Sequence, residues 1–533
     1  MKNLNTCLAS LGLLCLAVAL PASAQHGDPA SLPDAFDEPM PLYTAALGTY
    51  TRPISSTNTE AQAYFNQGVQ MMYAFTKQDA ARSFREAQQR DSTCAICFWG
   101  EAWAWGSYLN GAMQEDEAPH AYAAIQKALA LAEDHASANE KAFIEAMAVR
   151  YIEDYDREAR AVQDTAYAEA MRGVYEAYPN DLDAATLYAE ALFLLEPRLG
   201  FRDLDDPDLQ RLHGVLETIL DADITHPGAC HLYIHATEST TRPEKAEGCA
   251  AYLGNAIPGA SHINHMPSHT YNEVGRWADA VRANIQAWHS DQKADIGEGF
   301  AIYPSHNLHM LLFAASMDGQ GALAIQAGKD YAKLTGNSMY HVLTLIRFGR
   351  FDEVPDVEER PERTVPGALW DFAQGYARLR TGEPDFARVY LDRVLTTADT
   401  SEARFRFHPA NFLLGAVGGI LEGELHRDAG DLDAAIASFE RAVALEDSLD
   451  YDEPEPLPFA ARHWLGAALL EAERYADAEH VYRAALDDHP HNGWSLFGLK
   501  AALKAQGLSS PTVDADFEAS WARSDTWIRG SRF

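Results

Sequence analysis

Small and apolar residues recur every three to four positions along the chain from about Glu60 onward. This period places apolar side chains on one face of a helix, and hardly any segment shows the alternation that a half-buried strand requires. The pattern therefore predicts an all-α chain. Residues 25–58 are rich in Pro, Asp, Ser and Thr and have no sustained period, so we expect an irregular lead-in there.

Three stretches of the predicted helices repeat one arrangement of small and aromatic residues. Its members are Gly68, Ala80, Phe84 and Ala87 near the start, then Gly423, Gly430, Ala435, Phe439 and Ala442, and finally Leu465, Gly466, Tyr475, Ala478, Tyr482, Ala485 and Pro490. The arrangement resembles the tetratricopeptide repeat (TPR), in which small residues let two antiparallel helices pack closely. The resemblance implies a helical-hairpin solenoid with a concave groove.

The N-terminus has the features of a secretory signal. A short cationic start is followed by an apolar run and an Ala-Ser-Ala site, which predicts cleavage after Ala24 and a periplasmic or secreted protein. No later run of about twenty apolar residues follows, so we expect no membrane span. We divide the rest into an N-terminal and central TPR-like array at 59–400, C-terminal TPR repeats at 401–508 and a capping segment at 509–533.

Acidic residues outnumber basic ones by a wide margin. The 533 residues include 78 Asp and Glu against 42 Lys and Arg, for a formal net charge of -36. A phosphate backbone requires a basic face, so this balance argues against nucleic acid as a partner. A solvated acidic surface that keeps an exported protein soluble is the simpler interpretation, and an acidic groove for cationic ligands or metal ions is the alternative. A peptide or protein partner in the concave groove fits the repeat fold.

Four cysteines remain after removal of the signal, in a compartment that permits disulfides. Cys94 and Cys97 are close enough in sequence to pair, and Cys230 with Cys249 is the natural second bridge. In the repeat register that bridge would join two helices of one hairpin. Buried free thiols are the alternative for this second pair.

Histidines are concentrated in the middle of the chain. Nine of the twenty lie between Thr225 and Met310. Seven of these form three clusters with internal spacings of three or four, namely His231 and His235, then His262, His265 and His269, then His306 and His309. Such spacings put side chains on one face of a helix, so each cluster is expected on one helix.

The repeat register relates the three clusters to one another. We take Ala246, Ala280 and Ala324 as the small residues that open three successive second helices. Counting back from them, His231, His265 and His309 occupy one position, His262 and His306 a second, and His235 and His269 a third. Since first helices line the inner surface of a TPR array, all seven imidazoles and Glu238 are expected to face the groove.

Neutral imidazoles on one helix face are ligands that late transition ions prefer. Neighbouring helices pack about 8–10 Å apart, so adjacent helices can share an ion while the first and third cannot. Two adjacent sites with three imidazoles each would suit copper, and two imidazoles with Glu238 and water would suit zinc or iron. A histidine-rich groove without metal and packing alone remain alternatives. His226, before Pro227, is interpreted as a helix cap or a residue supporting the site.

Several motifs together resemble a group of exported bacterial TPR proteins. They are CHLYIHATE, HMPSHTY, HNLHML and the closing repeat that begins at Ala461. The resemblance implies fold and export and no activity. Two function classes follow from the residues themselves. One is a binding scaffold with a histidine-rich transition-metal site in its groove. The other is a metalloenzyme, oxidative with copper or iron and hydrolytic with zinc, in which Glu238 is a ligand or general base.

Overall fold

The structure, a computed structural model, describes residues 32–197 and 200–533. The predicted signal and the first residues of the lead-in lie outside this part. Within it almost all regular structure is helical, and the one sheet is a short hairpin of β1 (Arg404–Phe405) and β2 (His408–Pro409). The predicted all-α, TPR-like fold is confirmed.

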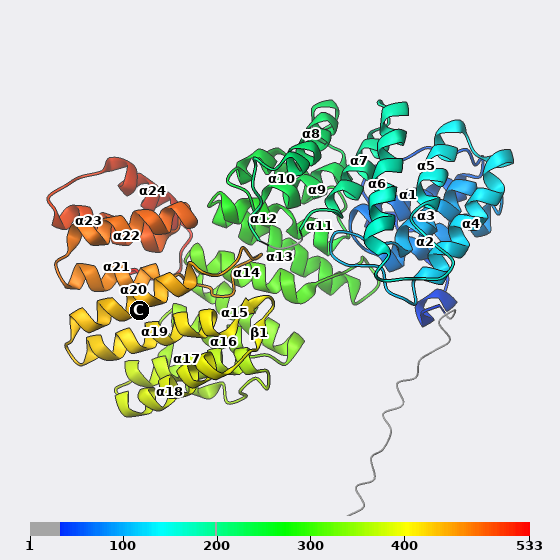
Figure 1. Cartoon of the computed structure of the whole chain (residues 1–533). Helices are drawn as coiled ribbons and strands as arrows, with labels where there is room; N and C mark the ends of the chain where they lie inside the picture. Colours follow the sequence, from blue (N-terminus) through cyan, green and yellow to red (C-terminus); the bar gives the residue numbers. More distant parts are fainter. Residues whose placement is uncertain (1–31, 198–199) are drawn as a thin grey trace, which may run out of the picture.

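The helices follow one another along a curved solenoid, coloured by sequence in Figure 1. The N-terminal helices are α1 (Thr59–Tyr73), α2 (Lys77–Arg90), α3 (Ala95–Trp105), α4 (Ala118–His135), α5 (Ala138–Ala148), α6 (Arg160–Ala177), α7 (Leu182–Phe193) and α8 (Pro207–Ala222). The central helices are α9 (Pro227–Thr237), α10 (Glu247–Leu253), α11 (Ser261–His265), α12 (Pro267–Glu273), α13 (Trp277–Ala294), α14 (Pro304–Met317), α15 (Gly321–Thr335) and α16 (Met339–Arg347).

The C-terminal helices complete the array. They are α17 (Thr364–Arg380), α18 (Pro384–Thr400), α19 (Ala410–Asp428), α20 (Leu432–Glu446), α21 (Arg462–Glu471), α22 (Tyr475–Asp488), α23 (Gly493–Ala505) and α24 (Pro511–Trp521). Short 3-10 helices η1 (Asp34–Asp37), η2 (Pro243–Ala246) and η3 (Phe351–Asp356) connect or precede them.

Glycines at the hairpin contacts explain why successive helices approach closely. A Cβ added at Gly68 on α1 would lie 2.6 Å from the ring of Phe84 on α2, and one at Gly100 on α3 would lie 2.5 Å from the same ring. The buried Phe84 ring therefore occupies space that a side chain at either glycine would need. The same relation joins Gly423 on α19 to Phe439 on α20, at 2.4 Å.

The described part of the lead-in contains the short helix η1 and is otherwise held against α1 by side chains. Gln67 accepts a hydrogen bond from the Tyr43 amide at 2.9 Å, and Gln70 accepts one from the Gly48 amide at 2.7 Å. Arg52 donates to Asp181 at 2.9 Å, which ties the lead-in to the start of α7. These bonds satisfy backbone groups that have no partner in a helix or sheet.

The C-terminal repeats return to the middle of the chain, so the two halves of the solenoid meet near α13 and α14 (Figure 1). The Trp277 indole on α13 donates to the Pro490 carbonyl at 2.9 Å. The Trp494 indole on α23 donates to the Ser316 carbonyl on α14 at 2.8 Å. This return brings the loop between α20 and α21 over the central helices.

The segment 509–533 does more than cap the last repeat. Its helix α24 packs on α23, but the residues after it run back to earlier helices. Asp525 accepts the Gly321 and Ala322 amides at the start of α15, at 2.6 and 2.9 Å. The Tyr376 hydroxyl on α17 donates to the Phe533 carbonyl at 2.9 Å. The tail therefore connects α15 and α17 to the C-terminal end of the array.

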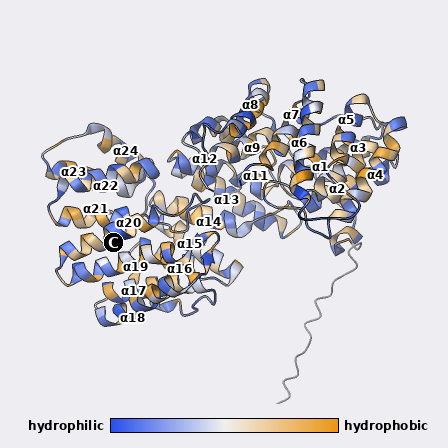
Figure 2. Ribbon diagram, in the orientation of Figure 1, coloured by the Kyte–Doolittle hydropathy of each residue, from blue (hydrophilic) through white to orange (hydrophobic). Residues whose placement is uncertain are grey.

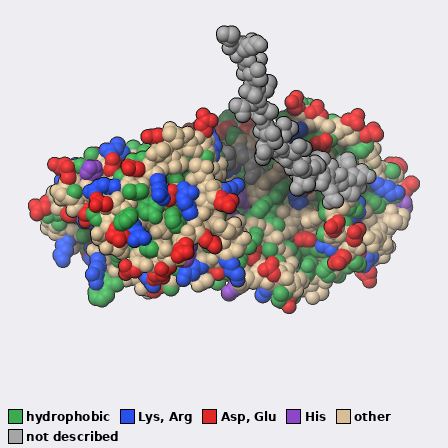
Figure 3. All heavy atoms as spheres, turned by 90° about the horizontal axis from the view of Figure 1, so that it is seen from below, with side chains coloured by type: hydrophobic (Ala, Val, Ile, Leu, Met, Phe, Trp, Pro, Cys, Tyr) green, Lys and Arg blue, Asp and Glu red, His purple; other side chains and the backbone are tan. Residues whose placement is uncertain are grey.

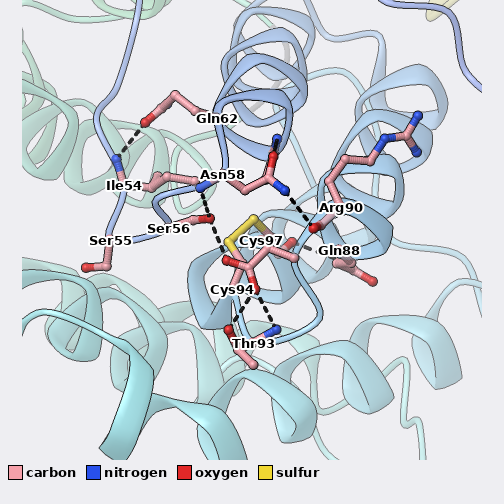
Figure 4. The surroundings of a disulfide bond; sticks show 12 residues. Ile54, Ser55, Ser56, Asn58, Gln62, Gln88, Arg90, Thr93, Cys94 and Cys97 are labelled. Carbon is pink, nitrogen blue, oxygen red and sulfur yellow. Dashed lines mark hydrogen bonds between the residues drawn. A yellow bond between two sulfur atoms is a disulfide. The ribbon is translucent and has the colours of Figure 1, made fainter.

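Of the four cysteines after the predicted signal, two form a disulfide and two are free thiols. Cys94 and Cys97 form a disulfide at the start of α3, close to Asn58, which donates to the Arg90 carbonyl at 2.9 Å (Figure 4). The expected second bridge is absent, because Cys230 and Cys249 are buried free thiols. The Cys230 thiol donates instead to the Ile224 carbonyl at 3.3 Å.

Hydrophobic and hydrophilic positions are mixed along each helix (Figure 2), as expected for helices that bury one face. Among the described residues, no helix combines the length and the apolar character needed to cross a bilayer. Acidic side chains are spread over the face in Figure 3 and are interspersed with basic ones.

Glu190 generates a prediction about stability. It is buried on α7 and accepts a hydrogen bond from the Trp103 indole at 3.1 Å. Burial raises its pKa to about 7, against the opposing effect of Arg150. Because the folded pKa lies above the unfolded one, the neutral acid favours folding below pH about 4.5, and this contribution is lost as the pH rises to about 7.

We expect Glu190→Gln to remove about 3 kcal/mol of pH-dependent stability between pH 5 and 8. The amide can still accept the indole bond and carries no charge to desolvate. Urea denaturation across this pH range measures the difference. The exposed Glu176→Gln is the matched control and should follow the wild-type curve. Parallel curves for wild type and Glu190→Gln would contradict the assignment.

Candidate metal centre

The histidine clusters lie on α9, α11, α12 and α14. His231 and His235 are on α9, and His306 and His309 are on α14, as predicted. The middle cluster differs from the prediction, since α11 ends at His265 and α12 begins at Pro267. Proline lacks the backbone N–H that would continue the helical hydrogen bonds. Met266 keeps helical dihedrals between the two, so His269 stays near His265.

Six of the seven predicted imidazoles form two groups of three. In the first triad, His231, His235 and His262 have ring centroids 4.9 to 6.3 Å apart. In the second triad, His265, His269 and His306 have centroids 4.7 to 5.7 Å apart. In each triad one ring nitrogen per residue lies within 4.8 Å of the others, close enough for a shared ion.

The two triads touch each other. The His262 and His265 rings are 5.1 Å apart, and the His235 and His269 rings are 5.2 Å apart. Each triad takes its imidazoles from neighbouring helices, and no triad spans α9 and α14 together. The spatial limit derived from helix spacing therefore matches the grouping found.

Two of the three histidines at the first register position contact a histidine at the second position of the next cluster. His231 contacts His262, and His265 contacts His306, so the first register position of one helix meets the second position of the next. His309 also occupies the first position, but the ring it meets on α16 is Tyr340, stacked at 4.2 Å.

His309 is consequently outside both triads, which corrects its assignment as a ligand. No histidine on α16 faces it, and its Nδ1 lies 3.4 Å from both the Tyr340 hydroxyl and an Arg406 nitrogen. The sequence register could not reveal this, because it aligns residues along each helix and says nothing of what the next helix offers.

Ring nitrogens face one another inside both triads. Nε2 of His231 is 3.2 Å from Nε2 of His262, and Nε2 of His265 is 3.1 Å from Nε2 of His269. Two nitrogens bound at about 2.0–2.1 Å to one tetrahedral ion lie about 3.3 Å apart. His231 donates from Nδ1 to the Tyr73 carbonyl at 2.6 Å, which directs an unprotonated Nε2 into the triad.

Glu238 contacts one histidine of each triad. Its two carboxylate oxygens accept from Nδ1 of His235 at 2.7 Å and from Nδ1 of His269 at 2.5 Å. Glu238 is only 4% exposed. Nδ1 bonds to a carboxylate orient an imidazole so that Nε2 can bind a metal. This geometry makes Glu238 a residue that orients two of the imidazoles, and it also lies in a group of possible ligands with His235 and His269.

Glu453 is a member of the site that the sequence did not indicate. It lies in the loop Leu449–Phe459, an acidic and proline-rich segment with no recognisable motif. Its carboxylate is 2.9 Å from Nδ1 of His269, and with Glu238, His235 and His269 it forms a third group of possible ligands. No local sequence pattern marks Glu453, because its position depends on the C-terminal repeats, which bring this loop over α12.

The loop is anchored by its neighbour Asp452. That buried carboxylate accepts from His408 at 2.9 Å and pairs with Arg406, and Arg406 also donates to the Glu453 carbonyl at 3.0 Å. The β1–β2 hairpin therefore holds the loop in place. His408 therefore has a structural role.

The imidazoles are buried beneath this loop. His231, His235, His262, His265 and His269 are at most 4% exposed. The prediction that they face inward holds, but the groove at this point is filled and is not open to solvent. Small cavities remain beside Glu453, lined by His269 on one side and by His235 and Glu238 on the other.

Burial and neighbouring charges set the protonation of the cluster. Desolvation and adjacent histidines hold the pKa of His231, His262 and His265 well below the usual range, and that of His306 falls to about 3. These four are neutral at pH 7, the form that binds metal. Burial opposes the charged form of His269, but Glu238 and Glu453 outweigh it and raise its pKa to about 10.

Several buried ring nitrogens lack a hydrogen-bond partner among the described residues. Within the triads they include Nδ1 of His262 and Nδ1 of His265, on rings whose centroids are 5.1 Å apart. A buried polar atom without a hydrogen bond costs about 1–3 kcal/mol.

His226 has the capping role expected of it. It is the N-cap of α9 and accepts from the Ala229 amide at 3.1 Å. Its other nitrogen lies 3.3 Å from Asp183, away from both triads.

Comparison with known proteins bears on the fold. A tetratricopeptide-repeat family model matches residues 420–493. A search of curated proteins found no match to the chain.

Solved structures with a similar chain path include the following three. The APC/C hetero-tetramer Cut9-Hcn1 is 12% identical, over 89% of this chain and 79% of that chain, with a TM-score of 0.30. The human IFIT1 dimer with m7Gppp-AAAA is 11% identical, over 88% and 90%, with a TM-score of 0.31. The P58(IPK) TPR domain is 12% identical, over 84% and 99%, with a TM-score of 0.22. At these TM-scores the likenesses carry no argument about function.

The contact between Glu238 and His269 gives a prediction for the metal-free protein. Removing one partner of a buried ion pair costs about 3–5 kcal/mol, so Glu238→Gln should be destabilising by that order at pH 6.5. The raised pKa of His269 contributes stability below about pH 6.5 that is lost as the pH rises through about 10. The difference between wild type and variant should therefore shrink over that interval.

Urea denaturation in excess EDTA, repeated from pH 6.5 to 10, measures this difference. Glu217→Gln is the control, since Glu217 also accepts from a tyrosine and a lysine but is half-exposed. It should cost no more than about 1 kcal/mol. A Glu238→Gln penalty that is small or independent of pH would refute the buried ion pair.

Proposed function

We propose that the protein is an exported TPR scaffold that binds a pair of transition-metal ions in the two histidine triads. One observation carries the proposal. Six imidazoles, five of them buried and His306 partly exposed, form two triads, and in each a pair of Nε2 atoms lies 3.1 or 3.2 Å apart, close to the separation that one tetrahedral ion imposes. Copper and zinc fit this all-imidazole donor set best, and iron fits it if the carboxylates take part.

The surroundings of the triads support binding of cations. Glu238 and Glu453 supply two negative charges next to the imidazoles and offset part of the charge of two divalent ions. The Tyr73 carbonyl and Glu238 fix the orientation of His231, His235 and His269 through Nδ1, the arrangement usual for metal-bound histidines.

A metalloenzyme is the second candidate. Each triad offers three protein ligands, and three is the number typical of catalytic sites that keep one position for water or substrate. In that role an ion would act as a Lewis acid or redox centre, and Glu238 would orient its ligands.

Export and partner binding complete the proposal. The N-terminal signal pattern and the Cys94–Cys97 disulfide support a periplasmic or secreted location, where disulfides persist. TPR arrays commonly bind peptide or protein segments, which supports a peptide or protein partner for the concave groove.

The metal content of triad variants tests the proposal. Protein purified from an oxidising compartment and reconstituted with Zn²⁺ or Cu²⁺ should retain two ions per chain after dialysis. His231→Ala should lose the ion of the first triad and His306→Ala that of the second, so each variant retains one. Elemental analysis by mass spectrometry gives the stoichiometry.

His309→Ala is the matched control, because His309 shares the repeat register and burial of the ligands but lies outside both triads. It should retain two ions. Absence of metal above background in reconstituted wild type would exclude the proposal. Equal loss in His309→Ala and the triad variants would exclude the assignment of ligands.

An exogenous ligand separates scaffold from enzyme. If each ion keeps an open position, azide should bind to Co²⁺- or Cu²⁺-loaded protein and change its visible absorption, because the added anion enters the coordination sphere. The metal-free protein treated with azide is the control. A spectrum that azide leaves unchanged would favour closed, structural sites.

A further inference from the structure

A large cavity adjoins the second triad on the side of α14 and α15. Its volume is about 710 Å³, within the range of small-molecule pockets. Four helices and the β1–β2 hairpin contribute its walls. His306 and His309 lie at the end that faces the metal centre.

The lining of this cavity has no acidic residue. It includes three arginines, namely Arg363, Arg404 and Arg406. This composition runs against that of the chain, which has 78 acidic and 42 basic residues. The local excess of positive charge therefore belongs to the cavity and not to the protein as a whole.

Two of these arginines are unpaired. Arg406 is neutralised by Asp452. Arg363 and Arg404, by contrast, have no carboxylate within 4.0 Å among the residues that the structure describes, and Arg404 donates only to the Phe407 carbonyl, at 2.6 Å. Unpaired guanidinium groups at the rim of a cavity retain the donors that bind a carboxylate in a two-pronged fashion.

The start of α17 adds to the positive potential. Thr364 and Val365, in the first turn of this 17-residue helix, line the cavity, and no side chain caps that turn. Free N–H groups and the helix dipole both favour an anion there. Arg363 is the N-cap residue itself, so its guanidinium and the helix terminus act from the same side.

The inner wall is aromatic. Tyr331 and Tyr340 are in edge contact at 4.9 Å, and Phe405 meets Tyr340 edge-on at 6.5 Å. A flat apolar body is stabilised against such a wall through offset or edge contacts. The cavity thus combines unpaired cations at its rim with aromatic rings deeper in.

We propose that this cavity binds a small organic anion, a carboxylate attached to an aromatic ring. The carboxylate would pair with Arg363 and Arg404, and the ring would lie against Tyr331 and Phe405, beside His306. The binding site is complete in the polypeptide itself, so the inference extends beyond the metal proposal and does not depend on it.

Benzoate is a suitable probe, with benzamide as its neutral isostere. Calorimetric titration of the full mature chain in EDTA should show benzoate binding at least about tenfold more tightly than benzamide, since the charge is the difference between them. Arg363→Gln and Arg404→Gln should each weaken benzoate binding by about tenfold and leave benzamide unchanged. Both arginines are exposed, so we expect the variants to fold like wild type, and circular dichroism checks this.

Arg388→Gln is the matched control, because Arg388 is an exposed arginine on the neighbouring α18 and does not line the cavity. It should bind benzoate like wild type. Absence of benzoate binding up to about 10 mM, or equal affinity for benzamide, would overturn the proposal. Sulfate binding as tight as benzoate would overturn the aromatic part of it. Because all titrations use metal-free protein, their failure is distinct from failure of the metal proposal.

Discussion

The carboxylate of Glu238 is the interaction on which the centre of the molecule depends. It accepts from His235 on its own repeat and from His269 on the next, and so couples two helical hairpins through one buried group. Without a negative charge there, His269 could not remain buried in its charged form, and neither imidazole would have a fixed orientation. The imidazoles can be packed together because four of them are neutral and the charge of His269 is offset by carboxylates.

Closure of the solenoid supplies what the repeats alone cannot. The first helices provide the imidazoles, but the cover over them comes from the loop that carries Asp452 and Glu453, which reaches the site because the C-terminal repeats return to α13 and α14. The β1–β2 hairpin fixes that loop through His408 and Arg406. One arginine of the anion cavity thus also holds the cover of the metal centre, so the two sites share a structural element.

Local patterns in the sequence were sufficient for the fold and for most of the histidine cluster. The period of three to four gives helices, and the recurring small residues give hairpins, because both depend on neighbours close in sequence. The register relates His231, His235, His262, His265, His269 and His306 to one another for the same reason, and the structure brings these six together. It failed for His309, whose environment depends on Tyr340 in the following layer. Glu453 was out of reach, because its place is set by closure of the whole array, and the expected Cys230–Cys249 bridge required a geometry that spacing does not encode.

The position of Glu453 so late in the chain has a consequence for assembly. All six triad histidines lie on helices that end before Asp318, whereas the loop that covers them belongs to the last third of the polypeptide. A chain that folds from its N-terminus therefore completes the donor set while the centre is still open to solvent, and closes it only when α21–α24 dock on α13 and α14. The order of residues along the chain separates the step in which the ligands assemble from the step in which they are sealed.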